Sequence, residues 1–189
     1  HPGYGFLSEN VEFAKIVMDH NVSWIGPSLD AISSMGDKMA ARDLALKANL
    51  PIVPGTKSEL NNIDEAYKIA EKIGYPILIK AAGGGGGKGM RIIQSENDLE
   101  DAILVAESEA ENSFSDKRVY IEKYLEEPHH IEVQVFGDST GNIISLGERE
   151  CSIQRRYQKI IEESPSPFIS NDLRSKLSKA AIRIAKACN

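Results

Sequence analysis

The sequence predicts an α/β protein whose helices and strands are organised in α+β lobes. Residues 52–124 follow the order helix, strand, strand, helix, strand. Residues 131–136 alternate strictly and are followed by a turn and a returning run at 143–146, as in a β-hairpin. The 189 residues are enough for one ordinary domain or two small lobes, and a hydrophobic content of 41% is adequate for a packed core.

Residues 1–51 predict the end of an N-terminal α/β lobe together with connecting helices. Ser8 is expected to cap a first helix, and residues 22–25 are expected to form a strand after it. Ser28 is expected to cap a short helix that ends at Gly36. This range therefore predicts one β-α-β fragment of an α/β layer.

Another helix is expected to follow directly, with Asp37 as its N-cap and Lys38 in its first turn. A cation in the first turn opposes the helix macrodipole, so a purely structural position would carry a carboxylate more often. Lys38 is therefore a candidate functional residue, and a solvated surface lysine is the simpler alternative.

Residues 52–124 predict a small lobe that follows a connection marked by proline and glycine. Asn62 and Glu65 fit a capping box at the start of its first helix, and Gly74 is suited to end that helix. Residues 119–124 alternate like a strand and close the lobe.

Within this lobe, the apolar run at 77–82 leads into five glycines at 83–87, and a second β-branched run follows at 91–93. Two strands joined by a loop without Cβ atoms predict a hairpin whose backbone N–H groups can approach an anion closely. Lys80 on the strand and Lys88 in the loop would add positive charge there. The stretch therefore predicts a flap that covers phosphates.

Two other glycine-rich motifs fit this stretch poorly. A P-loop needs a glycine and a hydroxyl residue at the positions that Ala82 and Gly89 occupy. Gly84, Gly86 and Gly89 satisfy the dinucleotide-binding spacing, but that motif also requires a helix directly after the loop, and a β-branched run follows instead. A flexible linker is unexpected between two paired strands.

Residues 125–189 predict the start of a further lobe. Hairpin strands at 131–136 and 143–146 precede a polar, basic segment at 148–159, and a last helix begins near Asn171. The strict alternation of residues 131–136 and the turn residues at 137–142 make the hairpin the clearest element of this lobe.

Three features leave more than one interpretation open. Residues 122–125 fit an ordinary surface strand or a strand end whose accessible backbone pairs with a purine edge. His129 and His130, which precede Glu132, point to opposite faces of a strand, so one hydrogen-bonding histidine is favoured over a shared metal ion. The three cations within 154–159 fit a solvated face or an anion site.

Lys159 is the last cation of this basic cluster, and it lies directly before Ile160 and Ile161. If this apolar pair is buried, the ammonium group lies at the edge of the core. Its charge would act more strongly there than in water.

The composition excludes several classes of protein. A net charge of −6 argues against a nucleic-acid surface, which requires clustered positive charge. No apolar run reaches the ~18–20 residues of a membrane span, and no signal-peptide pattern is present.

Cys151 and Cys188 follow no metal-binding spacing, so we expect two reduced thiols in a cytosol-like compartment. The chain begins at His1 without Met and stops within a helical pattern at Asn189, so we expect an excised segment of a longer polypeptide.

Five sequence blocks stand in one order over nearly the whole chain. They are HPGYGFLSEN at 1–10, MGDK at 35–38, IKAAGGGGGKGM at 79–90, EKYLEEPHHIEVQV at 122–135 and ERECSIQRRYQK at 148–159. Together they resemble the biotin carboxylase component of biotin-dependent carboxylases, which is an ATP-grasp enzyme. The resemblance implies an ATP-grasp fold, incomplete at both ends, in which ATP is clamped between two lobes under the glycine flap. It also implies that bicarbonate is phosphorylated to carboxyphosphate, which decomposes to CO2 that carboxylates N1′ of biotin on a carrier protein.

Matched by motif, the candidate site residues surround a nucleotide and a bicarbonate ion. The resemblance implies phosphate contacts from Lys38 and Lys80, flap contacts from Gly86 and Gly87, an adenine border of Glu122, Lys123, Tyr124 and Leu125, ribose and phosphate contacts from His130 and Gln154, and a bicarbonate contact from Lys159. Positioning and charge neutralisation of this kind are the main means of catalysing phosphoryl transfer. The family often carries His where this chain has Tyr157, and Arg is also common where it has Lys88, so the nucleotide contact of Tyr157 is the weaker assignment.

The resemblance implies ATP and Mg2+ as cofactors and carrier-linked biotin as a substrate, with the metal ligands outside this segment and none within it. It implies a biotin carboxyl carrier protein or domain and a carboxyltransferase as partners, and a homo-oligomeric parent in the cytoplasm or the mitochondrial matrix, with fatty acid biosynthesis as the expected process. No nucleic-acid or membrane partner is expected. Two alternatives stay open, namely another bicarbonate-activating ATP-grasp ligase of the carbamoyl-phosphate type and a nucleotide-binding module without chemistry. We expect the segment alone to bind nucleotide without turnover.

Overall fold

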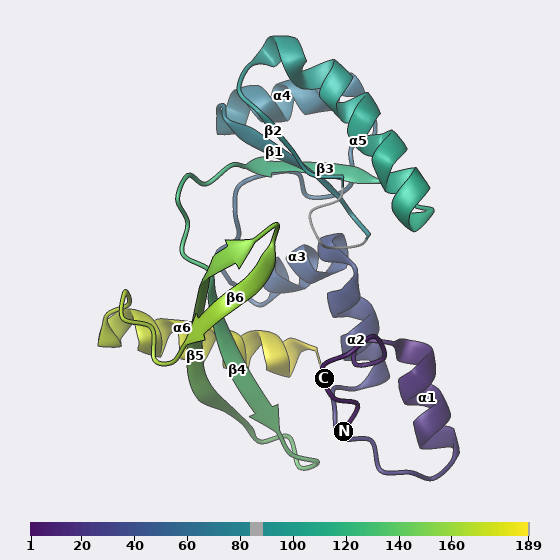
Figure 1. Cartoon of the computed structure of the whole chain (residues 1–189), viewed down its shortest axis with the longest axis vertical. Coiled ribbons are helices and arrows are strands. Elements are labelled where there is room, and N and C mark those ends of the chain that lie inside the picture. Colours follow the sequence, from purple (N-terminus) through teal and green to yellow (C-terminus); the bar gives the residue numbers. More distant parts are fainter. Residues whose placement is uncertain (84–88, 189) are drawn as a thin grey trace.

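The structure is a computed structural model that describes residues 1–83 and 89–188 (Figure 1). Within these ranges it is a mixed α/β arrangement of two three-stranded sheets with helices packed on them. The elements are α1 (Val11–Asp19), α2 (Leu29–Gly36), α3 (Lys38–Lys47), α4 (Ile63–Ile73), β1 (Ile77–Ala81), β2 (Arg91–Ile93), the short 3-10 helix η1 (Glu96–Asp98), α5 (Leu99–Phe114), β3 (Val119–Lys123), β4 (Ile131–Gly137), β5 (Ile143–Arg155), β6 (Gln158–Glu163) and α6 (Asn171–Ala187). Gly86, Gly87 and Lys88 lie outside the described residues.

Two expectations for the N-terminal part are wrong. Helix α1 is capped by Asn10, whose side chain accepts a hydrogen bond from the backbone N–H of Phe13 at 2.7 Å. The Ser8 hydroxyl instead donates to the carbonyl of Gly5 in the preceding turn. Residues 22–25 do not form a strand, because no strand of the described chain pairs with them and a β-branched composition alone does not satisfy the backbone groups. The β-α-β fragment is therefore not formed.

The next two helices begin where the sequence predicts. The Ser28 hydroxyl caps α2, which ends at Gly36. Asp37 caps α3, because its Oδ1 accepts hydrogen bonds at 2.8 and 3.0 Å from two backbone N–H groups of the first turn. Lys38 is thereby fixed as the first residue of α3.

The small sheet has the strand order β2-β1-β3, and both pairings are antiparallel. Ile77, Ile79 and Ala81 of β1 are buried in a core with residues of α4 and α5, the helices that cover this face of the sheet (Figure 1). Lys80 points to the opposite face, because side chains alternate along a strand. The antiparallel pairing of β1 with β2 confirms the predicted strands on both sides of the glycine run.

Helix α4 begins with half of the predicted capping box. The Asn62 side chain accepts a hydrogen bond from the backbone N–H of Glu65 at 2.9 Å. The Glu65 carboxylate reaches the backbone N–H of Asn61 at 3.1 Å rather than that of Asn62. Gly74 ends the helix with a φ of 73°, a backbone conformation that favours glycine, as predicted.

The second sheet has the strand order β4-β5-β6 and confirms the predicted hairpin of residues 131–136 with 143–146. Strand β5 continues to residue 155, so most of the polar segment at 148–159 lies on β5 and β6. Arg156 and Tyr157 form the two-residue turn between these strands with φ values of 51° and 63°, which is typical of a type I′ hairpin. Helix α6 begins at Asn171, as predicted, and packs on β4 and β5 (Figure 1).

Two further expectations concern the thiols and the membrane. Cys151 and Cys188 are both free thiols, and Cys151 is buried, in agreement with the prediction of reduced cysteines. In the part of the chain that the structure describes, no helix combines the length and the apolar character that crossing a bilayer requires.

Candidate active site

Lys80 and Glu122 meet on the face of the small sheet that α4 and α5 leave uncovered. Strand pairing sets Lys80 opposite Tyr120 and Leu78 opposite Glu122, and the alternation of side chains directs all four to this face. Lys80 Nζ donates to Glu122 Oε1 at 2.5 Å. The two side chains are only 23% and 10% exposed, so this ion pair is largely shielded from water.

Arg42 brings α3 to the same carboxylate. Its Nη1 lies 3.4 Å from Glu122 Oε2, and its Nη2 donates to the carbonyl of Val53 at 2.9 Å. The guanidinium group lies 5.7 Å from the centroid of the Tyr120 ring. Glu122 is thus a shielded carboxylate between two cations, which compensates the cost of burying its charge. No sequence pattern indicates Arg42, because 80 residues separate it from Glu122.

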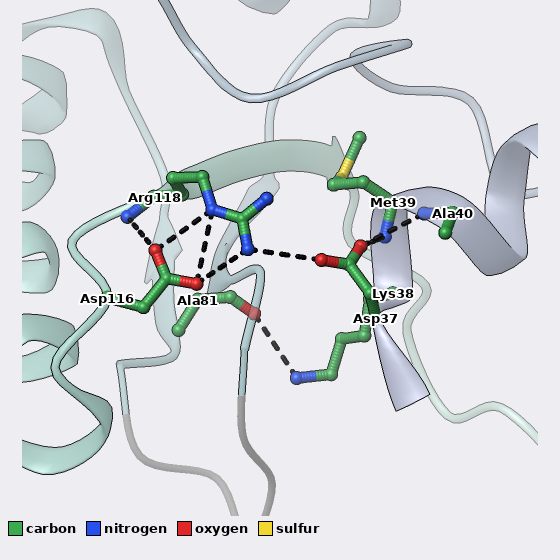
Figure 2. A network of polar contacts seen from close by, with 7 residues as sticks. All are labelled: Asp37, Lys38, Met39, Ala40, Ala81, Asp116 and Arg118. Carbon is green, nitrogen blue, oxygen red and sulfur yellow. Dashed lines mark hydrogen bonds and ion pairs between the residues drawn. The ribbon is translucent and has the colours of Figure 1, made fainter. Parts of the chain in front are cut away.

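Lys38 lies at the end of β1, where its Nζ donates to the carbonyl of Ala81 at 3.2 Å (Figure 2). Burial lowers the pKa of Lys38, and the positive charge of Lys80 lowers it further, against the opposing effects of Glu122 and Asp37. The fold therefore holds two repelling ammonium groups close to the start of the glycine run. An anion placed between them would relieve that repulsion, so the arrangement can bind a phosphate.

The predicted adenine border, residues 122–125, is largely occupied by contacts within the chain. Lys123 Nζ donates to the carbonyls of Gly74 and Tyr75 at 3.0 and 2.9 Å, so this side chain binds the C-terminal end of α4. The backbone N–H of Lys123 donates to Pro54 at 2.7 Å, and that of Tyr124 donates to Pro76 at 3.2 Å. The expected accessible backbone is therefore not found at these two amides, because neighbouring loops use them.

Leu125, the last residue of that range, lies beyond the end of β3. Its side chain is 48% exposed. Of the four residues, Leu125 is thus the one whose apolar side chain is open to a ligand.

A second cluster gathers on β4, β5 and β6 around Glu132. Strand pairing sets Glu132 opposite Arg149, and Arg149 Nη2 donates to Glu132 Oε2 at 2.8 Å. Lys159 Nζ forms an ion pair with Glu132 Oε1, and His130 Nε2 lies 3.2 Å from the same oxygen. Gln154 Nε2 lies 2.6 Å from His130 Nδ1, so the fold brings three of the predicted site residues, His130, Gln154 and Lys159, into one cluster.

Glu132 links these predicted residues and was not itself among the predicted site residues. Burial raises the pKa of Glu132, but the hydrogen bond and charge of Lys159, together with Arg149 and His130, outweigh it and lower the pKa below its ordinary value. The carboxylate therefore stays ionised and orients Lys159. The strict alternation of β4 places Glu132 on one face, but only the pairing with β5 shows what it meets.

Lys159 also lines a pocket of about 390 Å³ at the end of the β5–β6 hairpin, together with Arg155, Arg156, Gln158 and Ile160. Ile160 and Ile161 are 60% and 49% exposed, so the premise that they are buried is wrong. Lys159 owes its position to Glu132 rather than to the edge of a core. Tyr157, in the hairpin turn, is 62% exposed.

The two adjacent histidines contact different carboxylates. His129 Nδ1 lies 3.5 Å from Glu150 Oε1, whereas His130 contacts Glu132. Within residues 1–83 and 89–188, no group of three or more His, Cys, Asp or Glu side chains is arranged to hold a metal ion. The favoured interpretation of His130 as a hydrogen-bonding residue agrees with this geometry.

Comparisons with known proteins identify the family. Residues 37–189 match the family model described as carbamoyl-phosphate synthase L chain, ATP binding domain, and residues 1–32 match the one described as biotin carboxylase, N-terminal domain. Biotin carboxylase 1 of Bacillus subtilis (strain 168) is 50% identical over 187 residues, which are 99% of this chain and 42% of that relative. The chain therefore spans less than half the length of this relative.

Solved structures agree with the sequence relatives. A crystal structure of a biotin carboxylase–β-γ-ATP complex from Campylobacter jejuni matches with a TM-score of 0.93 and 50% identity over 98% of this chain and 42% of that chain. The biotin carboxylase domain dimer of the Hydrogenobacter thermophilus 2-oxoglutarate carboxylase, in complex with MgADP, ADP and bicarbonate, matches with a TM-score of 0.92 and 44% identity over 100% of this chain and 42% of that chain. The protein therefore belongs to the family of the carbamoyl-phosphate synthase L chain ATP-binding domain and, within it, to the biotin carboxylases, with the ATP-grasp fold.

Proposed function

We propose that this chain takes part in the ATP-dependent carboxylation of carrier-bound biotin by bicarbonate, through carboxyphosphate. The observation that carries the proposal is the bond of Lys38 Nζ to the carbonyl of Ala81, which places this ammonium group at the end of the strand that carries Lys80, next to the glycine run. The complexes of similar proteins with β-γ-ATP and with MgADP and bicarbonate support the assignment of these ligands. The proposed enzyme is an ATP-dependent ligase.

The small lobe would bind the nucleotide. Two ammonium groups held close to the flap are suited to the phosphates, where charge neutralisation is the main contribution to phosphoryl transfer. The proposed nucleotide contacts are Lys38, Lys80, Gly86 and Gly87 for the phosphates, and Glu122, Lys123, Tyr124 and Leu125 around the adenine. The pairing of Glu122 with Lys80 makes its carboxylate an orienting group for that lysine.

The second sheet would bind bicarbonate and the rest of the nucleotide. Lys159 is proposed to hold bicarbonate, with Glu132 fixing the ammonium group in place. His130 and Gln154, which lie 2.6 Å apart, would contact the ribose and phosphates, and Tyr157 is a further proposed contact. An oxygen of bicarbonate would attack the γ-phosphorus of ATP, and ADP would leave. Carboxyphosphate would then break down to phosphate and CO2, and biotin N1′ would attack the CO2 as the N1′ proton passes to that phosphate.

Mg2+ would neutralise phosphate charge in this reaction. No described group of carboxylates fits a metal ion, so none of the residues described above is assigned to Mg2+. The steps proposed for Lys38, Lys80 and Lys159 rest on their own charges and positions.

The partners and cellular setting are proposed from the family. A biotin carboxyl carrier protein or domain and a carboxyltransferase would supply and use the carboxylated biotin. The biotin carboxylase domain of the similar 2-oxoglutarate carboxylase is a dimer, which supports a homo-oligomer for this protein. We also propose fatty acid biosynthesis as the process and the cytoplasm, or the mitochondrial matrix, as the compartment; both depend on the final carboxyl acceptor.

The test is a Lys159→Ala substitution in the full-length protein. We expect biotin-dependent release of phosphate from ATP in the presence of bicarbonate to fall by about 100-fold or more, while ATP affinity stays within about twofold. Full activity in this variant would contradict the role of Lys159. Absence of any activity in the unmodified protein, with ATP binding intact, would favour a nucleotide-binding module without chemistry.

A second candidate is another bicarbonate-activating ligase that forms carbamoyl phosphate. It is favoured by the description of the family model that matches residues 37–189. The match of residues 1–32 to the biotin carboxylase N-terminal domain weighs against it. Phosphate release that depends on ammonia instead of biotin would select this candidate.

A further inference from the structure

Arg118 stands at the centre of a polar network that joins α3, β1 and β3 (Figure 2). Its Nε lies 3.0 and 3.1 Å from the two carboxylate oxygens of Asp116, and its Nη2 lies 2.7 Å from Asp116 Oδ2. The same Nη2 donates to Asp37 Oδ2 at 3.1 Å, although 81 residues separate these two positions. A planar guanidinium is well suited to bridge two carboxylates in this way.

Asp37 uses its two oxygens for two different contacts. Oδ1 caps α3 through the first-turn amides, and Oδ2 accepts from Arg118. Because α3 begins at Lys38, directly after this cap, the position of Asp37 sets the position of Lys38. The contact of Arg118 therefore acts on the helix end that carries the proposed phosphate-binding lysine.

The network also holds the start of the glycine run. The backbone carbonyl of Arg118 accepts a hydrogen bond from the backbone N–H of Ala82 at 2.9 Å. A Cβ on Gly83 would lie 3.1 Å from Asp116 Oδ2, so this carboxylate closely approaches the first glycine. Together with the bond of Lys38 to the carbonyl of Ala81, the bond of Ala82 fixes two consecutive residues at the start of the flap.

Charge and packing both support the network. Burial raises the pKa of Asp37, but the backbone N–H of Ala40, Arg118 and the backbone N–H of Met39 together lower it below its ordinary value. The hydrogen bonds of Arg118 lower the pKa of Asp116 against the opposing effect of burial. Met39, Ala82 and Tyr120 form a small buried apolar cluster beneath the same junction. The ammonium of Lys38 is disfavoured by burial and by Lys80, so its position depends on such supporting contacts.

Resting on the proposed function, we propose that Arg118 is a positioning residue for the nucleotide site. It acts through Asp37, which fixes Lys38 in position for binding phosphates, while Asp116 orients the guanidinium group of Arg118. The Arg118 side chain is 42% exposed, and in this role it acts on ATP indirectly, through its carboxylate partner Asp37.

The test is an ATP titration of the full-length protein by isothermal calorimetry. We expect Arg118→Ala to weaken ATP affinity about fivefold, because Lys38 is then less firmly placed. Asp37→Ser keeps an N-cap hydroxyl but removes the partner of Arg118, so it should weaken ATP affinity to the same extent while α3 stays capped. Arg118→Lys retains the charge but loses the bridging geometry, and should fall between wild type and Arg118→Ala.

The decisive comparison repeats Arg118→Ala in a Lys38→Ala background. If Arg118 acts through Lys38, the second substitution should change ATP affinity by less than about twofold. Lys47→Ala is the matched control, because Lys47 lies on the same helix in an exposed ion pair with Asp43 and should leave ATP affinity unchanged. Thermal unfolding of each variant by circular dichroism confirms that it is folded.

Two results would overturn the proposal while the proposed function stands. One is an Arg118→Ala variant that binds ATP as tightly as the unmodified chain. The other is an equal loss of affinity with and without Lys38, which would mean that Arg118 acts independently of that lysine. Absence of ATP binding to the unmodified, folded chain would overturn the proposed function itself, and this proposal with it.

Discussion

Glu122 shows how one shielded carboxylate holds two cations at the candidate site. Lys80 and Arg42 both pair with it, and its side chain is only 10% exposed. Glu122→Gln keeps the shape but removes the charge, so both cations lose their counter-charge. We expect the free energy of unfolding to fall by roughly 3 kcal/mol, measured by urea denaturation.

An exposed ion pair provides the control for this prediction. Asp43 pairs with Lys47 on the surface of α3, where the two side chains are 56% and 72% exposed. Asp43→Asn should change the free energy of unfolding by less than about 0.5 kcal/mol. Similar losses in the two variants would contradict the special role of the shielded pair.

Single residues were predictable where their local position was unusual. Lys38 in a first helical turn, Lys80 before the glycines and Lys159 in a basic cluster all carried a local signal. Arg42 and Glu132 carried none, because each acquires its role through a partner that only the folded sheets bring near. The ionic partners of a site are set by strand pairing and helix docking, and these contacts are distant in the sequence.

Among the elements, the loop before α4 passes so close to β3 that it requires a glycine. A Cβ on Gly55 would lie 2.2 Å from the carbonyl oxygen of Ile121 and 2.8 Å from Cα of Glu122. Gly55→Ala should therefore push the loop away from β3 and lower the free energy of unfolding by more than about 2 kcal/mol in a denaturation experiment.

Gly36 is a suitable control for this substitution. A Cβ at Gly36 would meet no atom within 4 Å, so Gly36→Ala should leave stability nearly unchanged. A Gly55→Ala variant as stable as Gly36→Ala would show that the loop can move without cost.

The β4–β5 hairpin turn depends on one ionised side chain. Asp138 accepts hydrogen bonds from the backbone N–H groups and side chains of Thr140 and Asn142, at 2.8 to 2.9 Å. These bonds, first of all that from the Asn142 side chain, lower the pKa of Asp138 from its ordinary value of 3.8 to about 2. Because the pKa is lowered by folding, the contribution of Asp138 to stability is present above about pH 4 and is lost as the pH falls towards 2.

Carboxyl NMR titration measures this pKa directly. We expect a midpoint for Asp138 near 2, and Asn142→Ala should move it back towards 3.8. A midpoint that is already at the ordinary value in the unmodified chain would show that the turn does not hold the carboxylate.

Elements with a clear alternation of apolar and polar residues, or with a clear helix N-cap, were predictable. Elements that depend on a partner strand distant in the sequence were not. The alternation at 131–136 and 143–146 and the caps Ser28 and Asp37 identified a hairpin and two helices correctly. Residues 22–25 carry a strand-like composition but lack a neighbouring strand among the described residues, so they form no regular element. The length of β5 was missed because charged side chains on an open sheet do not form an apolar pattern.

At the scale of the whole molecule, two separate sheets each present a basic cluster organised by one glutamate. The order of five sequence blocks was enough to predict the family and the ATP-grasp fold, because such motifs keep their order along the chain. The way in which α3 docks on the small sheet was not predictable, since it rests on the long-range contacts of Arg42 and Arg118. The arrangement of the candidate active site therefore depends on how α3 packs against the small sheet.

The central claim is that Lys38 and Lys80 together bind the phosphates of a nucleotide. The most direct test is calorimetric titration of the unmodified chain, Lys38→Met and Lys80→Gln, each with ATP and with adenosine. We predict that both variants lose at least about tenfold in ATP affinity and bind adenosine as the unmodified chain does, because only the phosphates meet the ammonium groups. Unchanged ATP affinity in both variants, or an equal loss for adenosine, would contradict the account.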